Sequence, residues 1–284
     1  MSTIAARVVE TAAGRFEVTE TGAGRPIVLL HGALVGAELW DPLVALLASR
    51  GYRCIAPTLP LGAHHEAMRP GTDLTPPGVA RIIADLLPVL APTPATVVSN
   101  DTATALVQLV LADHPGVIGR AVLTSGDAFD YFFPPMFRPL QWAGHAPRLL
   151  RLVGRAARVR LLRNSPAGFG LLTSRGITDA QARRWTDALI NDAAVRADAA
   201  AFLRSVDKRY TLEVVDRLSS VDVPVLVAWS EKSRAFPMSY GERLAASIPG
   251  ARLETIPDSS CYSCIDNPER LAQLIDAFLQ EPSR

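Results

Sequence analysis

Continuous hydrophobic runs alternate with segments of helical spacing along most of the chain. PIVLLHG (26–32) is an apolar run that ends in glycine, which is typical of a strand buried on both faces of a sheet. RFEVTETG (15–22) alternates apolar and polar residues, which indicates an exposed antiparallel strand. By these criteria we predict strands at residues 15–22, 26–32, 52–60, 95–100, 120–126, 223–230 and 251–258. Helical spacing and stop signals predict helices at residues 39–49, 77–90, 102–115, 239–247 and 268–280.

This alternation of strands and helices predicts an α/β protein with a mostly parallel, doubly wound sheet. It breaks after Asp130, and residues 131 to about 215 hold helical segments without a clear strand. We therefore expect a core formed by residues 1–127 and 216–284, with residues 128–215 inserted as a helical cap. Such a cap would cover the carboxyl edge of the sheet, where ligands of open α/β sheets bind.

Composition narrows the function classes. The chain has 284 residues, 49% of them hydrophobic, so it can bury a large core. A net charge of +1 gives no reason to expect a nucleic acid partner. No apolar run reaches the ~20 residues of a membrane span, and the N-terminus lacks the pattern of a signal peptide. We therefore expect a cytoplasmic protein.

Three cysteines, Cys54, Cys261 and Cys264, are too few for a disulfide framework. The spacing of Cys261 and Cys264 would also suit a redox pair or two metal ligands. No second Cys or His pair has zinc-site spacing, so we predict neither a metal nor another cofactor.

The stretch VVSNDTATAL (97–106) joins a predicted strand to a predicted helix through a tight turn centred on Asp101. A small residue stands two positions to either side, Ser99 before and Ala103 after. A nucleophile elbow requires this pattern, because the central residue is strained and larger neighbours would strike the crossing chain. The alternative is that Asp101 is a plain N-cap of the following helix.

With this elbow about 70 residues after His31-Gly32, the chain resembles the α/β-hydrolase fold. It is most similar to the haloalkane dehalogenase and epoxide hydrolase branch, whose nucleophile is Asp. The resemblance extends from PIVLLHG to PERLAQLIDAFL. It implies that Asp101 is the nucleophile and that the backbone amides of Ala33 and Thr102 form the oxyanion hole.

The sequence departs from this family where the general base is expected. The family places a histidine in the loop after the last strand, and here Cys261 occupies that position. An unperturbed thiol has a pKa near 8.5 and is a poor substitute for histidine. The family's orienting acid is replaced by Ser233, so Asp127 and Asp130, which follow the strand at 120–126, become the candidate acids. The alternative is that both are solvated loop residues.

Aromatic residues crowd the junction of the predicted sheet and cap, and we expect them either to line a pocket or to be ordinary core. The candidates for substrate binding are His31, His64, Phe129, Phe133, Trp142 and Tyr262. His64 and His65 are also candidates for a displaced base, and Tyr131 and Tyr210 for the phenols that activate an oxirane in epoxide hydrolases.

Eight arginines and no acidic residue lie between Asp130 and Asp179. A solvated amphipathic cap helix explains them. An anionic substrate or carrier, or a membrane surface, is the alternative.

We favour an enzyme with a degenerate triad that acts on a bulky, apolar small molecule, with Asp101 as nucleophile or acid/base. Without the histidine, a cyclisation, isomerisation or elimination in secondary metabolism is plausible, because no water needs to be activated. One alternative is a hydrolase of an epoxide, ester or alkyl halide that works through a covalent ester at Asp101. Another is a binding protein without chemistry. The sequence leaves the oligomeric state open, including a homodimer.

Overall fold

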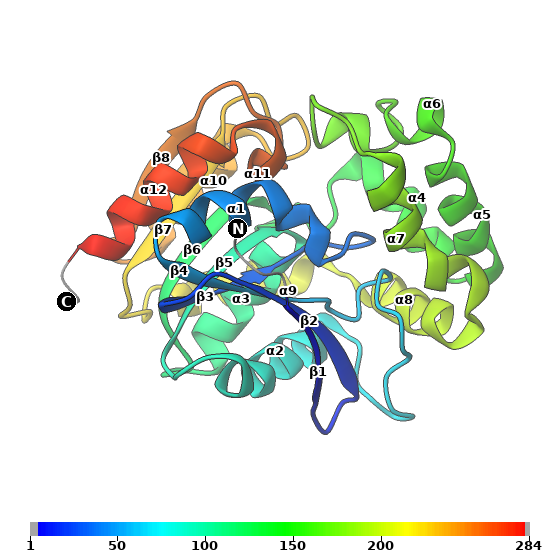
Figure 1. Ribbon diagram of the computed structural model, residues 1–284, viewed down its shortest axis with the longest axis horizontal. Helices are drawn as coiled ribbons and strands as arrows, with labels where there is room; N and C mark the ends of the chain where they lie inside the picture. The colour runs from blue at the N-terminus through cyan, green and yellow to red at the C-terminus, as the bar shows by residue number, and fades with distance from the viewer. Residues whose placement is uncertain (1–4, 282–284) are drawn as a thin grey trace.

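An eight-stranded, mostly parallel sheet forms the centre of the computed structural model, which describes residues 5–281 (Figure 1). The spatial order is β1-β2-β4-β3-β5-β6-β7-β8, and only the β1–β2 and β2–β4 pairs are antiparallel. This confirms the predicted fold class. The strands are β1 Ala5–Glu10, β2 Arg15–Thr21, β3 Arg25–Leu30, β4 Tyr52–Pro57, β5 Ala95–Asp101, β6 Ile118–Gly126, β7 Val225–Ser230 and β8 Arg252–Ile256.

Strand burial follows the hydrophobic pattern. Every residue of β5 and β7 is buried, as their continuous apolar runs predict, whereas β2 alternates between covered and more accessible positions. The sequence pattern did not predict β1, because only Val9 of this edge strand is buried. The predicted N-terminal and C-terminal ends of the core, residues 1–4 and 282–284, lie outside the described residues.

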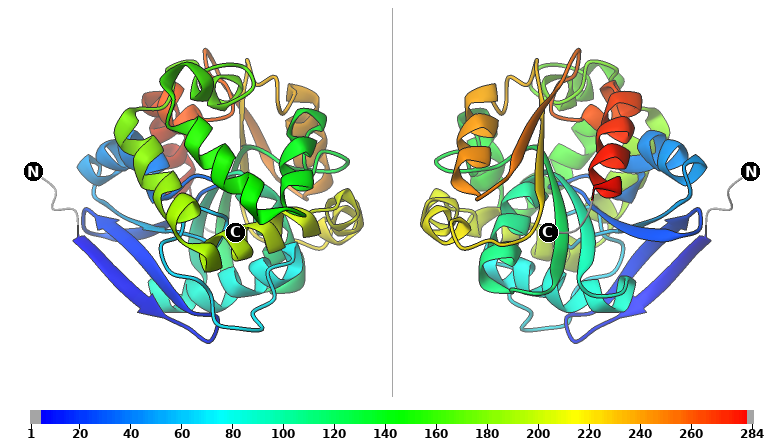
Figure 2. Two further views of the ribbon diagram at one scale, coloured as in Figure 1. Left: turned by 90° about the vertical axis from the view of Figure 1, so that its right-hand side faces the viewer. Right: turned by 90° about the vertical axis from the view of Figure 1, so that its left-hand side faces the viewer.

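Helices cover both faces of the sheet, with α10 and α12 on opposite sides (Figure 2). Helix α1 packs against α12, and α2 packs against α3. The flanking helices are η1 Ala37–Trp40, α1 Asp41–Ser49, α2 Pro76–Leu90, α3 Thr102–Asp113, α10 Met238–Ser247, α11 Ser263–Asp266 and α12 Pro268–Gln280. None of the helices within residues 5–281 has the length and apolar character needed to cross a membrane.

A helical segment separates β6 from β7 and stands beside the sheet (Figure 1). Its elements are η2 Pro135–Phe137, α4 Arg138–Ala143, α5 Pro147–Ala157, α6 Arg160–Arg163, η3 Phe169–Leu171, α7 Asp179–Asn191, α8 Ala193–Ser205 and α9 Lys208–Leu218. Helix α9 runs across the expected boundary at residues 215 and 216 and packs against α3. The division of the chain into core and cap stays a proposal.

The carboxyl ends of β5 and β6 approach each other very closely. Asp101 pairs with Gly126, and a Cβ atom added to Gly126 would lie only 2.2 Å from the Asp101 carbonyl oxygen. It would also lie 2.7 Å from Cβ of Thr104. A larger residue at position 126 would therefore displace the turn that carries Asp101.

We predict that Gly126→Ala lowers the free energy of unfolding by about 3 kcal/mol, because the added methyl group meets fixed backbone. Gly116→Ala is the control. Gly116 has φ +81° but open space around it, so its loss should stay near 1 kcal/mol. Urea unfolding of both variants measures the difference, and equal losses would contradict the close approach at Gly126.

Candidate active site

Asp101 occupies a strained turn between β5 and α3. Its backbone has φ 57° and ψ −129°, outside the regions that L-residues ordinarily adopt. Ser99 and Ala103 are completely buried, and a Cβ atom on Gly32 would lie 2.6 Å from the Asp101 carboxylate. The side chain makes no capping hydrogen bond to α3, so it does not act as a conventional N-cap. The strained backbone of Asp101 therefore fixes the position of its carboxyl group.

The loop after β8 brings a phenol and a thiol to this carboxyl group. The Tyr262 hydroxyl donates a hydrogen bond to Oδ2 of Asp101 at 3.3 Å. The Cys261 thiol, at the position where the resemblance led us to expect a histidine, donates to the Ser125 carbonyl oxygen at 3.3 Å. Both side chains are completely buried. Position 261 therefore carries a neutral hydrogen-bond donor.

Two polar residues that sequence reasoning missed hold this loop. The Asn100 side-chain amide donates to the Cys261 carbonyl oxygen and to the Thr124 hydroxyl, both at 2.8 Å. Asp266 accepts hydrogen bonds from the Ser260 amide at 2.9 Å and from the Thr173 hydroxyl at 2.7 Å. Neither residue has a sequence signal, because the partners are far apart along the chain.

Asp127 is a second buried carboxyl group next to the elbow. Its backbone amide donates to the Asp101 carbonyl oxygen at 3.2 Å. Neither of its carboxyl oxygens has a hydrogen-bond partner among residues 5–281. Burial, followed by the charge of Asp101, raises the pKa of Asp127 well above its usual value. Asp127 therefore holds its proton more tightly than an ordinary aspartate.

Asp101 titrates in the neutral range. Burial raises its pKa to about 7, although the Tyr262 hydroxyl and Thr102 act in the opposite direction. Burial also raises the pKa of the Tyr262 phenol well above its usual value, so the phenol stays a donor. Burial thus raises the pKa of both carboxyl groups, Asp101 and Asp127, and pKa values shifted in this way are common in sites that hold and exchange a proton.

Burial, helped by the charge of Asp101, raises the pKa of the Cys261 thiol well above its usual value. The thiol is thus protonated at neutral pH and cannot serve as a base. Cys264 is also free and buried, and burial raises its pKa too. Residues 5–281 contain no cluster of His, Cys, Asp and Glu side chains suited to a metal ion.

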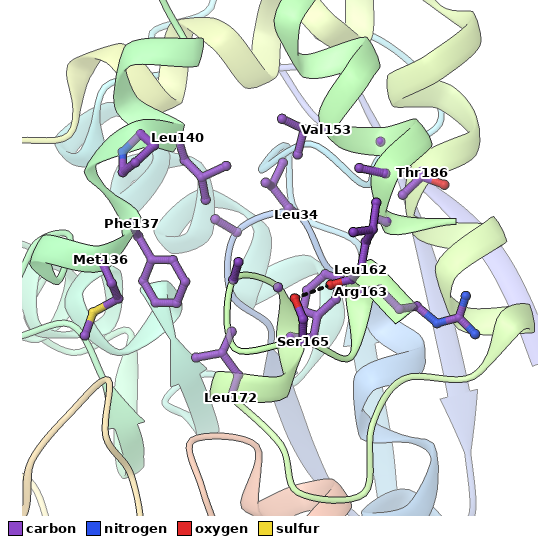
Figure 3. Close-up of a pocket in the computed structure, with 18 of the residues that line it drawn as sticks. Leu34, Met136, Phe137, Leu140, Val153, Leu162, Arg163, Ser165, Leu172 and Thr186 are labelled. Atoms are coloured by element: carbon purple, nitrogen blue, oxygen red, sulfur yellow. Dashed lines mark hydrogen bonds between the residues drawn. The ribbon is translucent and has the colours of Figure 1, made fainter. Parts of the chain in front are cut away.

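A cavity of about 560 Å³ opens above Asp101, and its walls are mostly apolar (Figure 3). Ala33, Thr102, Phe133 and Tyr262 line it together with Asp101, as the sequence led us to expect. The remaining apolar lining was not predicted individually, because it comes from helices without a motif. Its larger members are Leu34, Met136, Phe137, Leu140, Val153, Leu162, Phe169, Leu172 and Leu189.

Two aromatic candidates lie outside the cavity. Trp142 is 70% exposed, because α4 turns it to solvent while Leu140 points into the cavity. Phe129 is buried, but its ring lies under the Arg243 guanidinium at 4.0 Å. Neither residue lines the cavity, so the structure does not place them where we expected a substrate to bind.

The histidine candidates stabilise loops away from the cavity. His31 is completely buried, and its Nε2 accepts a hydrogen bond from the Leu59 amide at 2.8 Å. Burial lowers the pKa of His31 to about 4. The Nε2 atom of His64 lies 3.3 Å from the Asp198 carboxylate. His65 pairs with Glu17 at 3.1 Å. None of the three histidines lines the cavity.

Asp130 also lies away from the site. The chain reverses after Asp127, with Phe129 at φ 54°, so that the half-exposed Asp130 accepts a hydrogen bond from the Tyr240 hydroxyl at 3.0 Å. The Ser233 hydroxyl takes no part in the site either, because it accepts a hydrogen bond from the Phe236 amide. The two phenols considered for oxirane activation have other partners: Tyr131 packs on Tyr240, and the Tyr210 hydroxyl accepts a hydrogen bond from Arg209.

Comparison with known proteins is consistent with this architecture. The model of the "Alpha/beta hydrolase family" matches residues 27–274. A 2-hydroxy-6-oxononadienedioate/2-hydroxy-6-oxononatrienedioate hydrolase from Cupriavidus pinatubonensis is 27% identical, and the alignment covers 93% of this chain and 90% of the relative. A 2-hydroxy-6-oxo-6-phenylhexa-2,4-dienoate hydrolase from Burkholderia cepacia is 23% identical, with 93% and 91% covered.

Solved structures share the fold. An alpha/beta hydrolase fold protein from Burkholderia ambifaria superposes with a TM-score of 0.79 at 19% identity, covering 97% of this chain and 99% of that one. The epoxide hydrolase CorEH superposes with a TM-score of 0.75 at 14% identity, covering 98% and 99%. At these identities the similarity is one of fold.

The buried carboxyl group of Asp101 should cost stability at neutral pH. Its folded pKa of about 7 lies above the value of 3.8 for an ordinary Asp, so the folded state holds the proton more tightly. The stability that this group contributes is present at low pH and is lost as pH rises through about 7. We predict that Asp101→Asn raises the free energy of unfolding above pH 7 by up to roughly 4 kcal/mol.

This gain should shrink as the pH falls from about 7 and vanish below about pH 3, where Asp101 of the unmodified protein is protonated in both the folded and the unfolded state. Urea unfolding over this pH range measures it. The exposed Asp130→Asn is the matched control and should show no such pH-dependent gain. A destabilised Asp101→Asn variant at pH 8 would contradict the raised pKa.

Proposed function

We propose that this chain, which belongs to the alpha/beta hydrolase family, is an enzyme that moves a proton on a bulky, neutral, apolar molecule without adding water. The observation that carries the proposal is the pairing of Asp101, with its pKa of about 7, and the Tyr262 phenol at the base of an apolar cavity. A general acid or base works best when its pKa lies near the working pH.

The site offers no second base for water. The ionisable residues that line the cavity within residues 5–281 are Asp101, Tyr262 and Arg163. Arg163 is occupied by hydrogen bonds to the Ile177 carbonyl oxygen and the Asp179 carboxylate. Hydrolysis through a covalent ester at Asp101 needs a base that activates water, and a protonated thiol at Cys261 does not supply one.

Proton transfer uses the groups that are present. In its ionised form Asp101 can remove a proton from a carbon next to a carbonyl group. The Tyr262 hydroxyl and the amides of Ala33 and Thr102 would then support the negative charge that develops on the substrate oxygen. Returning the proton to another carbon gives an isomer. Attack of the activated carbon on a carbonyl or epoxide carbon of the same molecule breaks a bond from that carbon to oxygen and leaves the electron pair on the oxygen, which takes the proton back from Asp101, and the product is a ring.

The cavity favours a neutral substrate. The curated relatives are named for hydrolysis of a dienoate or a dienedioate, whose carboxylates call for a cation in the pocket. Here the one cationic side chain of the lining, Arg163, is satisfied by protein partners. An anion next to the buried carboxyl groups would be repelled. A polycyclic or terpenoid-sized ketone, lactone or epoxide fits these conditions.

One structural observation favours a second candidate, a hydrolase that forms an ester at Asp101. The elbow at φ 57° and ψ −129° is the backbone geometry that presents a nucleophile. Such an enzyme would attack an alkyl carbon of an epoxide or alkyl halide. In the absence of an activating base the ester would then persist. The third candidate, a binding protein without chemistry, would show no turnover of any bound ligand.

Tyr262→Phe should raise the pKa of Asp101 by about one unit, because it removes the hydrogen bond that stabilises the ionised carboxylate. Carbon-13 NMR of protein labelled at aspartate measures the titration. Tyr52→Phe is the matched control. Tyr52 donates an equivalent hydrogen bond to Asp276, so its loss should leave Asp101 unchanged. If both substitutions shifted the pKa of Asp101 by the same amount, the hydrogen bond from Tyr262 would have no specific effect on that pKa.

Isotope labelling tests the proposed reaction. The protein is incubated with neutral ketones, lactones and epoxides of terpenoid size, in D₂O or in ¹⁸O-water. We expect products that gain deuterium and no ¹⁸O, with Asp101→Asn slower by roughly 10³-fold. Asp130→Asn, the matched control, should keep full activity because Asp130 faces solvent.

The other outcomes separate the candidates. Products that contain ¹⁸O after many turnovers would overturn the proposal and show that an unidentified base activates water. A stable mass increase on the intact protein with short epoxides or alkyl halides, absent in Asp101→Asn, would favour the covalent candidate. Binding without conversion of any compound would favour the binding protein.

A further inference from the structure

The exposed hydrophobic side chains of this protein are concentrated on one segment. Among residues 5–281, ten large hydrophobic side chains are exposed, and seven of them lie between residues 136 and 162. Leu161 is 82% exposed and Trp142 70%. A segment with so many exposed hydrophobic side chains, here called the patch, marks an interaction site more often than scattered single residues do. The seven are Met136, Trp142, Leu149, Leu152, Val159, Leu161 and Leu162.

Unpaired positive charge accompanies these side chains. No acidic residue occurs between Asp130 and Asp179. Arg138, Arg148, Arg151 and Arg155 are exposed, and the described residues offer them no ion pair or side-chain hydrogen bond. Elsewhere in the fold exposed arginines commonly do pair, as Arg217 does with Asp113. The patch therefore complements a negatively charged partner.

Helix α5 cannot turn its leucines inward. Its inner face carries Leu150 and Gly154, and a Cβ atom on Gly154 would already lie 3.0 Å from Ile190 of α7. Leu149 and Leu152 are therefore left on the outer face at a spacing of three residues, which places them side by side. The arginines at positions 148, 151 and 155 form a parallel row. Helices that lie in a membrane surface have this combination.

Part of the patch borders the mouth of the cavity. Met136 and Leu162 line the cavity and are also about half exposed, so they mark the place where it reaches the surface. They stand on two sides of the cavity in Figure 3. Pro139 and Ala167, which also line the cavity, are exposed as well. A body that covers the patch would cover the mouth.

We propose that the cap surface, defined as residues 136–162 with their exposed leucines, Trp142 and arginines, docks on an anionic lipid bilayer. In this position an apolar substrate passes from the lipid directly into the cavity. A lipid surface accounts for both features, because side chains such as Leu161 gain by leaving water and the arginines gain by approaching anionic headgroups. An acidic carrier protein could pair with the arginines, but its charge would give no reason for the exposed leucines. Docking does not depend on the chemistry at Asp101.

Sedimentation with vesicles tests the proposal. The full-length protein should bind vesicles of equimolar phosphatidylcholine and phosphatidylglycerol, and bind phosphatidylcholine vesicles much more weakly. Replacing two arginines, R148Q with R151Q, should weaken binding to the anionic vesicles by roughly tenfold to thirtyfold. Replacing two leucines, L152S with L161S, should weaken it by about tenfold or more. These side chains are exposed, so the fold should be retained.

Matched control variants distinguish vesicle binding through the cap surface from nonspecific binding through exposed leucines and arginines elsewhere. L212S removes an exposed leucine from α9, and R81Q removes an exposed arginine from α2. Both control variants should bind like the unmodified protein, and so should Asp101→Asn. Equal losses in the control and cap variants would overturn the proposal, as would no binding to anionic vesicles. Capture by an acidic carrier protein with no vesicle binding would also overturn it.

Trp142 provides a direct probe of depth. The other three tryptophans, Trp40, Trp185 and Trp229, are at most 1% exposed. Quenching of tryptophan fluorescence by brominated phospholipids in anionic vesicles should therefore report Trp142, and W142F should lose this quenching while still binding. Binding without quenching in the unmodified protein would show that the arginines touch headgroups but the cap surface does not insert, which would overturn the proposed docking.

Discussion

Two carboxyl groups buried next to each other, for which residues 5–281 supply no cation that lowers their pKa values, determine the chemistry of the site. Asp101 is the last residue of β5, and Asp127 directly follows β6, the parallel neighbour of β5. The Asp127 amide donates a hydrogen bond of 3.2 Å to the Asp101 carbonyl oxygen. Two adjacent carboxylates cannot both ionise in a medium of low polarity. A histidine at position 261 would bring a positive charge when it took a proton. Cys261 brings none, so the carboxyl groups themselves must hold the proton.

Hydrogen bonds from the surrounding structure hold the loop that carries Cys261 and Tyr262 in place. Asn100 ties the Cys261 loop to the sheet, and Asp266 ties the same loop to the segment at Thr173. The Tyr262 amide also donates to the Leu172 carbonyl oxygen at 2.8 Å. A site that had merely lost its function would have no need for a strained residue at Asp101 or for a phenol held against it. This retained order favours a reaction over simple binding.

The fold could be predicted because burial leaves a periodic trace in the sequence. The continuous runs of β3, β5 and β7 identify the parallel centre, whereas β1, with only Val9 buried, leaves no trace. The elbow could be predicted because sterics demand small residues at positions 99 and 103. Asn100 and Asp266 could not, since their roles depend on partners distant in sequence. Likewise, nothing in SGDAFD distinguishes buried Asp127 from exposed Asp130 until the chain reversal at Phe129 is known.

The short helices between β6 and β7 form two surfaces, an inner one at the cavity and an outer one that faces solvent. Its inner side needs apolar residues to exclude water from Asp101, because solvation would return the pKa of that carboxyl group toward its ordinary value. Its outer side carries leucines and arginines that the protein itself leaves uncovered. Met136 and Leu162 belong to both surfaces. If the protein docks on a bilayer as we propose, an apolar ligand that enters between them need not cross water, and burial of its apolar surface in the cavity would favour its entry.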